Sequence, residues 1–220
     1  MTEIIGIVGF LGSGKNTVGD YLIKQYDYTR DSFAGPLKDA VSVVFGWNRE
    51  LLEGETKESR AWRDLPDEWW EERLDWANHP LNYMNKRFTP RLALQLWGTD
   101  VLRVGFFNDI WIASLEYRLK GASRIVVTDC RFPNEIKTIR KMGGKVIRVK
   151  RGPEPEWWDT AIAANSETFL HAPEAAKELD KLGIHISEWA WIGQEFDAVI
   201  HNDSTLEKLE ENIQWTLAQL

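Results

Sequence analysis

The chain has 220 residues, of which 43% are hydrophobic and 28% charged, a balance that is ordinary for a single globular domain. Its net charge of −7 argues against broad binding to nucleic acids, because no basic stripe is present to neutralise many phosphates. A single cysteine excludes an internal disulfide, and without a signal peptide or a membrane-spanning apolar run we expect a cytoplasmic protein with no membrane partner.

The first predicted element is a buried β-strand at Ile4–Val8, which breaks at Gly9 into a glycine-rich turn. A helical pattern begins after the turn and runs to Tyr26. Strand, glycine loop and helix in this order are the setting of a phosphate-binding loop, where backbone N–H groups and the positive end of the helix dipole face the phosphates. The candidate nucleotide contacts of the loop are Gly9, Leu11, Gly12, Ser13, Gly14, Lys15, Asn16 and Thr17.

The loop matches G-x-x-x-x-G-K, and Lys15 supplies a mobile positive charge for the outer phosphates. Asn16 stands where this pattern usually has Ser or Thr, and the hydroxyl comes one place later, at Thr17. Thr17 is therefore the candidate ligand of Mg²⁺, directly or through water, and Asn16 through water is the alternative. We interpret the chain as a nucleotide-binding protein.

The next predicted helix begins at Pro36 and carries Lys38 in its first turn. Lys38 is either a solvated surface lysine or a ligand contact. Residues 47–90 are rich in Glu, Arg and Trp, which suggests a partly helical excursion from the core. Arg60 and Arg63 lie in this excursion, and a charge run of this kind is usually a solvated face.

A clean helix resumes with Thr89 as N-cap and is predicted to end before Gly98. A further helix is expected from Asp109 to Gly121. It contains Trp111, which on its apolar spacing alone belongs to the core.

The second predicted strand is Arg124–Thr128, and it delivers Asp129 at its carboxyl end. Polar residues at the carboxyl ends of parallel strands face the ligand crevice, so Asp129 and Arg131 form the second candidate site. A helix from Pro133 and a third strand at Lys145–Val149 follow.

Residues 153–194 show no strand pattern, although a helix is expected at Pro173–Leu182. A segment of this length between two core strands is a candidate lid. The last unit is a strand at Asp197–His201 and a helix opened by a capping box from Ser204 to Glu207. Strands that alternate with helices predict a mostly parallel sheet covered by helices.

Six short motifs, taken together and in order, resemble those of the phage-type deoxynucleoside monophosphate kinases, a branch of the P-loop kinases. The loop is similar to the family's G-x-x-x-S-G-K-D/N-T, in which Asn at the position of Asn16 is accepted. The matching segments are Gly9–Thr17, Ala34–Ala40, Arg91–Asp100, Asp129–Arg131, Met142–Gly144 and His185–Glu188.

This resemblance implies a P-loop kinase fold of three α/β/α layers and one domain over residues 1–220. Residues 47–90 would be a helical excursion on the acceptor side and residues 153–194 a lid-like insertion. The implied reaction transfers the γ-phosphoryl group of ATP, with Mg²⁺, to a deoxynucleoside monophosphate, giving ADP and the diphosphate. The implied partner is this small molecule and not a nucleic acid. Related enzymes can be dimeric, which permits a homodimer, and a phage-encoded chain would act in the host cytoplasm.

By resemblance, Lys15, Arg91 and Arg131 are the catalytic candidates, with Arg131 assigned to the transition-state charge and Arg151 to the adenine side. The attacking phosphate oxygen is already anionic, so no general base is needed, and catalysis consists of positioning and neutralising charge.

The resemblance also assigns an acceptor site. Lys38 and Arg91 would grip the acceptor phosphate with help from one of two arginines, Trp111 would pack on the base or sugar, and Asp129 would contact the deoxynucleoside or orient Arg131. The acceptor-side candidates are Lys38, Arg60, Arg63, Arg91, Gly98, Thr99, Trp111 and Asp129.

Two alternatives stay open. One is a P-loop kinase for another small acceptor, such as a dephospho-coenzyme. The other is a nucleotide-dependent switch that is not a kinase. Lys38 and Arg91 speak against the switch, because a switch needs no second phosphate site.

Overall fold

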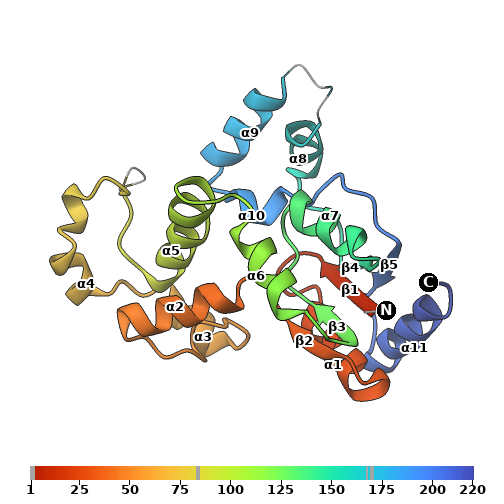
Figure 1. The fold of residues 1–220 in the computed structure, drawn as a ribbon. Helices are drawn as coiled ribbons and strands as arrows, with labels where there is room; N and C mark the ends of the chain where they lie inside the picture. Colours follow the sequence, from red (N-terminus) through yellow and green to blue (C-terminus); the bar gives the residue numbers. More distant parts are fainter. Residues whose placement is uncertain (1–2, 83–84, 167, 169–170) are drawn as a thin grey trace. The chain divides into compact units, whose positions relative to one another are not determined.

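The computed structural model describes residues 3–82, 85–166, 168 and 171–220. The chain divides into two compact units (Figure 1). The first combines residues 1–33 with residues 115–220, and the second is the uninterrupted stretch 34–114. No helix in the described ranges has the length and apolar character needed to cross a membrane.

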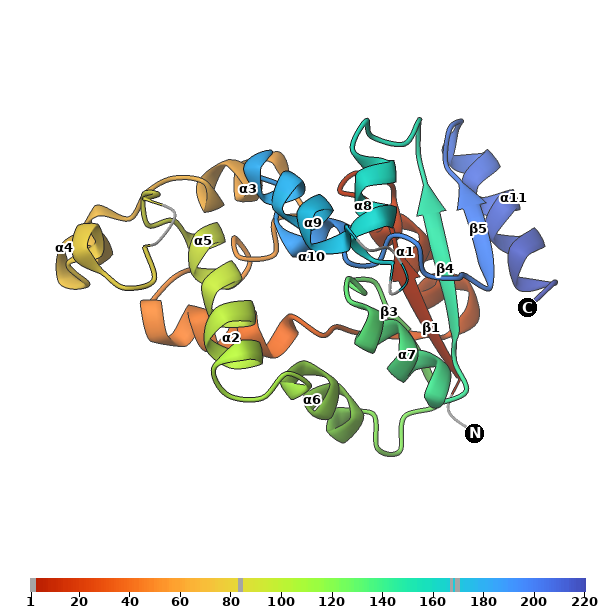
Figure 2. The same ribbon diagram turned by 90° about the horizontal axis from the view of Figure 1, so that it is seen from above.

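The first unit is built on a sheet of five parallel strands in the order β2-β3-β1-β4-β5. In β1, Ile5 lies opposite Val126 of β3 on one side and Lys145 of β4 on the other. Figure 2 shows β1, β4 and β5 side by side. The predicted parallel sheet is confirmed. The strands are β1 (Glu3–Val8), β2 (Thr29–Asp31), β3 (Arg124–Val127), β4 (Lys145–Lys150) and β5 (Ala198–His201).

Strand β2 is the element that the sequence pattern did not reveal. It has three polar residues at the edge of the sheet and pairs with β3. Strand prediction depends on apolar runs or alternation, and a short polar edge strand has neither. Its end places Asp31 and Ser32 against Arg118, whose Nη2 donates to Oδ1 of Asp31 at 2.8 Å and to the Ser32 carbonyl at 2.7 Å.

Helices cover both faces of the sheet, so the predicted three-layer α/β/α architecture is confirmed. Leu22 of α1 and Ile213 of α11 join Ile5 of β1 in one buried cluster, which places these helices on one face. Successive side chains of a strand point to opposite faces. A Cβ on Gly6 would lie 3.2 Å from Ile139, so α7 covers the other face. The helices of this unit are α1 (Lys15–Tyr26), α7 (Pro133–Lys141), α8 (Trp158–Ala164), α9 (Ala172–Lys181), α10 (Ile186–Trp189) and α11 (Leu206–Leu217).

The second unit is helical and packs around aromatic side chains. The Phe45 ring stacks on Trp47 with centroids 4.6 Å apart, and it meets Trp70 and Trp97 edge-on at 4.9 and 5.4 Å. Helix α6 (Ile110–Arg118) begins in this unit and ends in the first. The other elements are α2 (Gly35–Phe45), α3 (Lys57–Arg63), α4 (Glu68–Arg73), a 3₁₀ turn (Trp76–Asn78), α5 (Pro90–Gln95) and a π-helix (Leu96–Val104).

Two predicted helix boundaries are wrong. The helix expected to end before Gly98 continues as the π-helix to Val104, a wider coil that is often found at functional sites. The last helix is capped by Thr205 and not by Ser204: Thr205 Oγ1 accepts from the Lys208 N–H at 3.3 Å, because α11 begins one residue later than the capping-box pattern required. The Thr89 cap is confirmed, since its Oγ1 accepts from Leu92 N at 3.1 Å.

We expect Leu22→Ala to lower the free energy of unfolding by about 2–5 kcal/mol, because the Leu22 side chain is fully buried between α1 and the sheet. Urea denaturation measures this change. Leu206→Ala is the matched control, since Leu206 is 55% exposed and its truncation should change the stability by less than about 0.5 kcal/mol. Equal losses in the two variants would contradict the assignment of the core.

Candidate active site

The loop between β1 and α1 has the backbone of a phosphate-binding loop. Gly9 and Gly14 have φ angles of 147° and 103°, which side chains other than glycine rarely adopt. A Cβ on Gly9 would lie 2.4 Å from the Val149 carbonyl oxygen, and a Cβ on Gly14 would lie 2.4 Å from Nδ2 of Asn202. Both the conformation of the loop and its neighbours therefore require glycine at these two positions.

The amino end of α1 opens onto this loop. Its N-cap is Gly14, which has no side chain that could cap the first turn. The N–H groups of a first turn and the positive end of the helix dipole attract anions. The hydroxyl of Ser13 is buried and has no hydrogen-bond partner among the described residues. An anionic ligand with acceptor oxygens suits this arrangement.

Lys15 is folded back onto its own loop. Its Nζ donates to the carbonyl oxygens of Gly9 at 2.9 Å and Phe10 at 2.8 Å. Burial and the positive charge of Arg131 lower the pKa of Lys15 to about 8, and the carboxylates of Glu188 and Asp129 partly oppose this shift. A phosphate near Lys15 would add negative charge and so stabilise the charged form of its ammonium group.

Asp129 and Arg131 follow β3, and hydrogen bonds hold the side chain of Asp129 and the backbone of Arg131. Oδ1 of Asp129 accepts from the Phe33 N–H at 3.0 Å. The buried carboxylate of Glu135 accepts from the Arg131 N–H at 2.8 Å. The guanidinium of Arg131 forms an ion pair with Glu188 of α10 at 3.2 Å. The structure thus brings Lys15, Asp129 and Arg131 into one charged cluster of the first unit.

Glu188 is a member of this cluster that the sequence analysis did not select as a site residue. The available signal was the motif His185–Glu188, which resembled the family but suggested no role. The neighbouring Ser187 Oγ lies 3.5 Å from Arg131 Nη1 and 2.9 Å from His185 Nδ1. The motif therefore forms a polar surface that faces Arg131.

An aromatic cluster holds the other flank of the loop. Arg148 is buried and lies over two of the rings, 4.4 Å from that of Trp158 and 5.2 Å from that of Trp191. Glu154 pairs with Arg148 at 2.6 Å. The ring of Phe10, in the phosphate-binding loop, meets Trp157, Trp158 and Trp191 at centroid distances of 5.6, 6.0 and 5.0 Å. These contacts join the segment 153–194 to the loop.

Arg151 is exposed on the turn that follows β4. The next residue, Gly152, donates its N–H to Oδ1 of Asp203 at 2.6 Å. Arg151 is therefore placed at the carboxyl end of the sheet, on a turn that is tied to the end of β5.

The remaining candidates lie in the second unit, where several are paired with carboxylates. Lys38 forms an ion pair with Glu53, which also pairs with Arg49. Burial would raise the pKa of Glu53, but the two cations outweigh it and lower that pKa. Arg91 pairs with Asp64 through two nitrogens. These carboxylates were not anticipated from the sequence, and each one forms an ion pair with a candidate basic residue.

Arg60 and Arg63 both reach backbone carbonyls just before α3. Arg60 Nη1 donates to Glu55 O at 3.0 Å, and Arg63 Nη1 donates to Leu52 O at 3.4 Å. A Cβ on Gly54 would overlap the Arg63 guanidinium at 1.9 Å, so Arg63 lies flat against this turn.

The structure joins Trp111 to Gly98 in the same unit. Trp111 is 7% exposed, and its Nε1 donates to the Gly98 carbonyl at 2.9 Å. A Cβ on Gly98 would lie 2.8 Å from Leu37, so α2 also packs on this point of the π-helix, and Thr99 beside it is half-buried. The hydrogen bond from Trp111 therefore ties α6 to the π-helix. The sequence did not indicate this bond.

The donors around the loop suit Mg²⁺ that arrives with a nucleotide. Within the described ranges, no three His, Cys, Asp or Glu side chains form a group that could hold a metal ion. Mg²⁺ keeps several waters and takes one or two protein oxygens beside the substrate phosphates. Thr17 offers an exposed hydroxyl in the first turn of α1, which fits this requirement.

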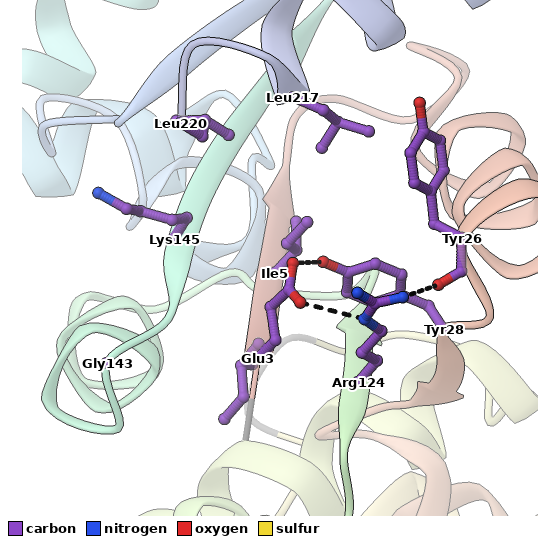
Figure 3. Close-up of a pocket in the computed structure, with 10 residues that line it drawn as sticks. Glu3, Ile5, Tyr26, Tyr28, Arg124, Gly143, Lys145, Leu217 and Leu220 are labelled. Atoms are coloured by element: carbon purple, nitrogen blue, oxygen red, sulfur yellow. Dashed lines mark hydrogen bonds and ion pairs between the residues drawn. The ribbon is translucent and has the colours of Figure 1, made fainter. Parts of the chain in front are cut away.

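A cavity of about 340 Å³ lies at the amino ends of the central strands, opposite the end of the sheet that carries the phosphate-binding loop (Figure 3). Its charged side chains are paired. Arg124 pairs with Glu3 at 3.1 Å, and Glu3 also accepts from the Tyr28 hydroxyl. Lys145 pairs at 3.3 Å with Asp197, which lies outside the lining. Glu3, Arg124 and Lys145 are the first residues of their strands, whereas the loop follows the end of β1. This cavity is therefore separate from the charged cluster around Lys15.

Comparison with known proteins gives consistent matches. A family model described as deoxynucleotide monophosphate kinase matches residues 71–165. A protein of Acanthamoeba polyphaga mimivirus, named provisionally as that kinase, is 32% identical over 162 residues, covering 67% of this chain and 74% of its own. The deoxynucleotide monophosphate kinases of Enterobacteria phage T4 and Escherichia phage RB69 are 24% and 23% identical, covering 99% and 96% of this chain and 100% and 98% of their own.

We expect ADP to bind about tenfold more weakly at pH 9 than at pH 7, because Lys15, with a pKa of about 8, loses its charge over this range while bound phosphate would hold the proton. Calorimetric titration across this range measures the effect. Lys15→Arg should remove it, since arginine stays charged, and Arg131→Ala should move the midpoint to higher pH by removing the adjacent positive charge. A flat profile in the unaltered protein would contradict this assignment.

Proposed function

We propose that this chain, which belongs to the deoxynucleotide monophosphate kinase family, transfers the γ-phosphoryl group of ATP to a deoxynucleoside monophosphate. The observation that supports this most directly is the cluster of Lys15 and Arg131 beside a glycine loop whose backbone suits phosphates. Basic residues in the second unit, Lys38 and Arg91, supply charge for a second phosphate.

The transfer needs little covalent chemistry from the protein. An anionic oxygen of the acceptor phosphate forms a bond to the γ-phosphorus of ATP as the bond from that phosphorus to the β-phosphate oxygen breaks, and ADP leaves with the electron pair. No proton has to be removed from the attacking oxygen. The protein aligns the two phosphates and stabilises the charge on the transferred group.

In this reaction the loop N–H groups hold the ATP phosphates and Lys15 leaves the carbonyls of Gly9 and Phe10 to reach the outer phosphates. Arg131 stabilises the charge on the transferred group, with Glu188 keeping its guanidinium in place until the substrates arrive. Asp129 accepts a hydrogen bond from the Phe33 backbone, and its negative charge offsets part of the positive charge near Lys15. Arg151 contacts the adenine side of ATP.

Kinases use Mg²⁺ with ATP, and here Thr17 would hold it directly or through water, with Asn16 reaching it through water. When bound, the ion neutralises charge on the outer phosphates. Residues 153–194 act as a lid over the loop, to which the cluster around Phe10 already joins them. A lid that excludes water protects the phosphoryl group from hydrolysis.

The acceptor site is assigned to the second unit. Lys38 and Arg91 exchange their carboxylate partners for the acceptor phosphate, and one of Arg60 and Arg63 assists. Gly98 and Thr99 line the site on the π-helix, which Trp111 holds in place beneath the base or sugar. Residues 47–90 form the helical excursion that carries part of this site.

We expect ADP formation from MgATP to depend on an added deoxynucleoside monophosphate, and to vanish in Lys15→Ala. Each dNMP and each NMP is offered separately and ADP release is followed by a coupled assay. Transfer to a dephospho-coenzyme and to no dNMP would favour the other small-acceptor kinase. Steady ATP hydrolysis that no dNMP changes would favour a nucleotide-dependent switch.

We expect Arg91→Ala to raise the KM for the dNMP about tenfold or more and to leave the KM for ATP unchanged, because a hydrogen bond to a charged group contributes about 1.5–3 kcal/mol. Initial rates with each substrate varied in turn measure both constants. Arg87→Ala is the matched control, since Arg87 forms an exposed ion pair with Glu71 in the same unit. Equal changes in both KM values would contradict an acceptor role for Arg91.

A further inference from the structure

Asn202 lies directly after β5 and is tied to two other segments of the first unit. Its side-chain Nδ2 donates to the carbonyl oxygen of Ser13 in the phosphate-binding loop at 2.8 Å. Its backbone N–H donates to the Lys150 carbonyl at the end of β4, also at 2.8 Å. β4 and β5 pair along Ile147–Lys150 and Ala198–His201, so Asn202 stands on a rigid base.

The bond to Ser13 sets the direction of a loop N–H group. In a trans peptide the C=O and the following N–H point in opposite directions. The Ser13 carbonyl points toward Asn202. The N–H of Gly14 in the same peptide therefore points away from Asn202, and it adjoins the first turn of α1, where N–H groups attract anions. Releasing the carbonyl would let this peptide turn and take the N–H with it.

The contact is close on both sides. A Cβ on Gly14 would stand 2.4 Å from Nδ2 of Asn202, so the amide occupies the space that any larger residue at position 14 would need. A carbonyl oxygen only accepts hydrogen bonds, so the group facing Ser13 has to be a donor. The contact requires glycine in the loop and a short donor side chain after β5.

We propose that Asn202 is a positioning residue, which acts through the Ser13–Gly14 peptide to keep the loop in its phosphate-binding conformation. That the ligand is ATP rests on the proposed function. The positioning of the loop by Asn202 does not, because it would affect the binding of any polyphosphate.

The test compares Asn202→Ala with Asn212→Ala. Asn212 is a matched control, because its Nδ2 donates to the carbonyl of His201 at 2.9 Å, next to Asn202 but outside the loop. Calorimetry measures binding of MgATP, inorganic tripolyphosphate and a dNMP to each variant. In Asn202→Ala, MgATP and tripolyphosphate should both bind about two- to tenfold more weakly, the usual loss for one hydrogen bond, with dNMP binding unchanged. Asn212→Ala should match the unaltered protein throughout.

Asn202→Ser retains a donor of shorter reach and should fall between Asn202→Ala and the unaltered protein. If the alanine variant does not fold, Asn202→Ser is compared in its place with the unaltered protein and with Asn212→Ala. Unchanged tripolyphosphate binding in these variants would overturn the proposal, as would a loss confined to MgATP, which would assign Asn202 to the nucleoside. Normal polyphosphate binding by the unaltered protein without transfer to any dNMP would refute the proposed function and leave the role of Asn202 standing.

Discussion

Lys15 and Arg131 place two positive charges near each other at the ends of β1 and β3, and the fold tolerates this only through fixed counter-charges and backbone acceptors. The carboxylates of Glu188 and Asp129 offset part of the repulsion, and the carbonyls of Gly9 and Phe10 accept from the Lys15 ammonium. In the proposed function, a bound polyphosphate takes the place of these contacts. The parallel sheet, the glycine loop and the turn after β3 together hold this pair of cations at one place.

Several of the twelve tryptophans of the chain have a structural role. Some enclose Phe45 in the second unit, and others surround Phe10 and the buried Arg148 in the first. Large rings give small helical segments a core that short aliphatic side chains would not fill. In the first unit they also connect the segment 153–194 to the phosphate-binding loop, through the contacts of Phe10 with Trp157, Trp158 and Trp191.

The parts that were predictable from sequence are those whose cause is local. The loop, the four longer strands and the Thr89 cap follow from glycine spacing, apolar runs and a capping residue within a few positions. Strand β2 escaped because a polar edge strand has no such signal, and the π-helix escaped because its register depends on contacts from Leu37 and Trp111. Glu188 and Asn202 are far from Lys15 in sequence, so only the folded chain reveals that they belong beside the loop.

The division of the chain has a consequence for its synthesis. The second unit is the contiguous stretch 34–114, whereas β1 has to pair with β3, with Glu3 opposite Arg124. A ribosome therefore releases all of the second unit before the central strand of the first has either neighbour. Pairing across so many residues is slow because of the entropy of closing a long loop. Early folding of the second unit would reduce the length of flexible chain that separates β1 from β3.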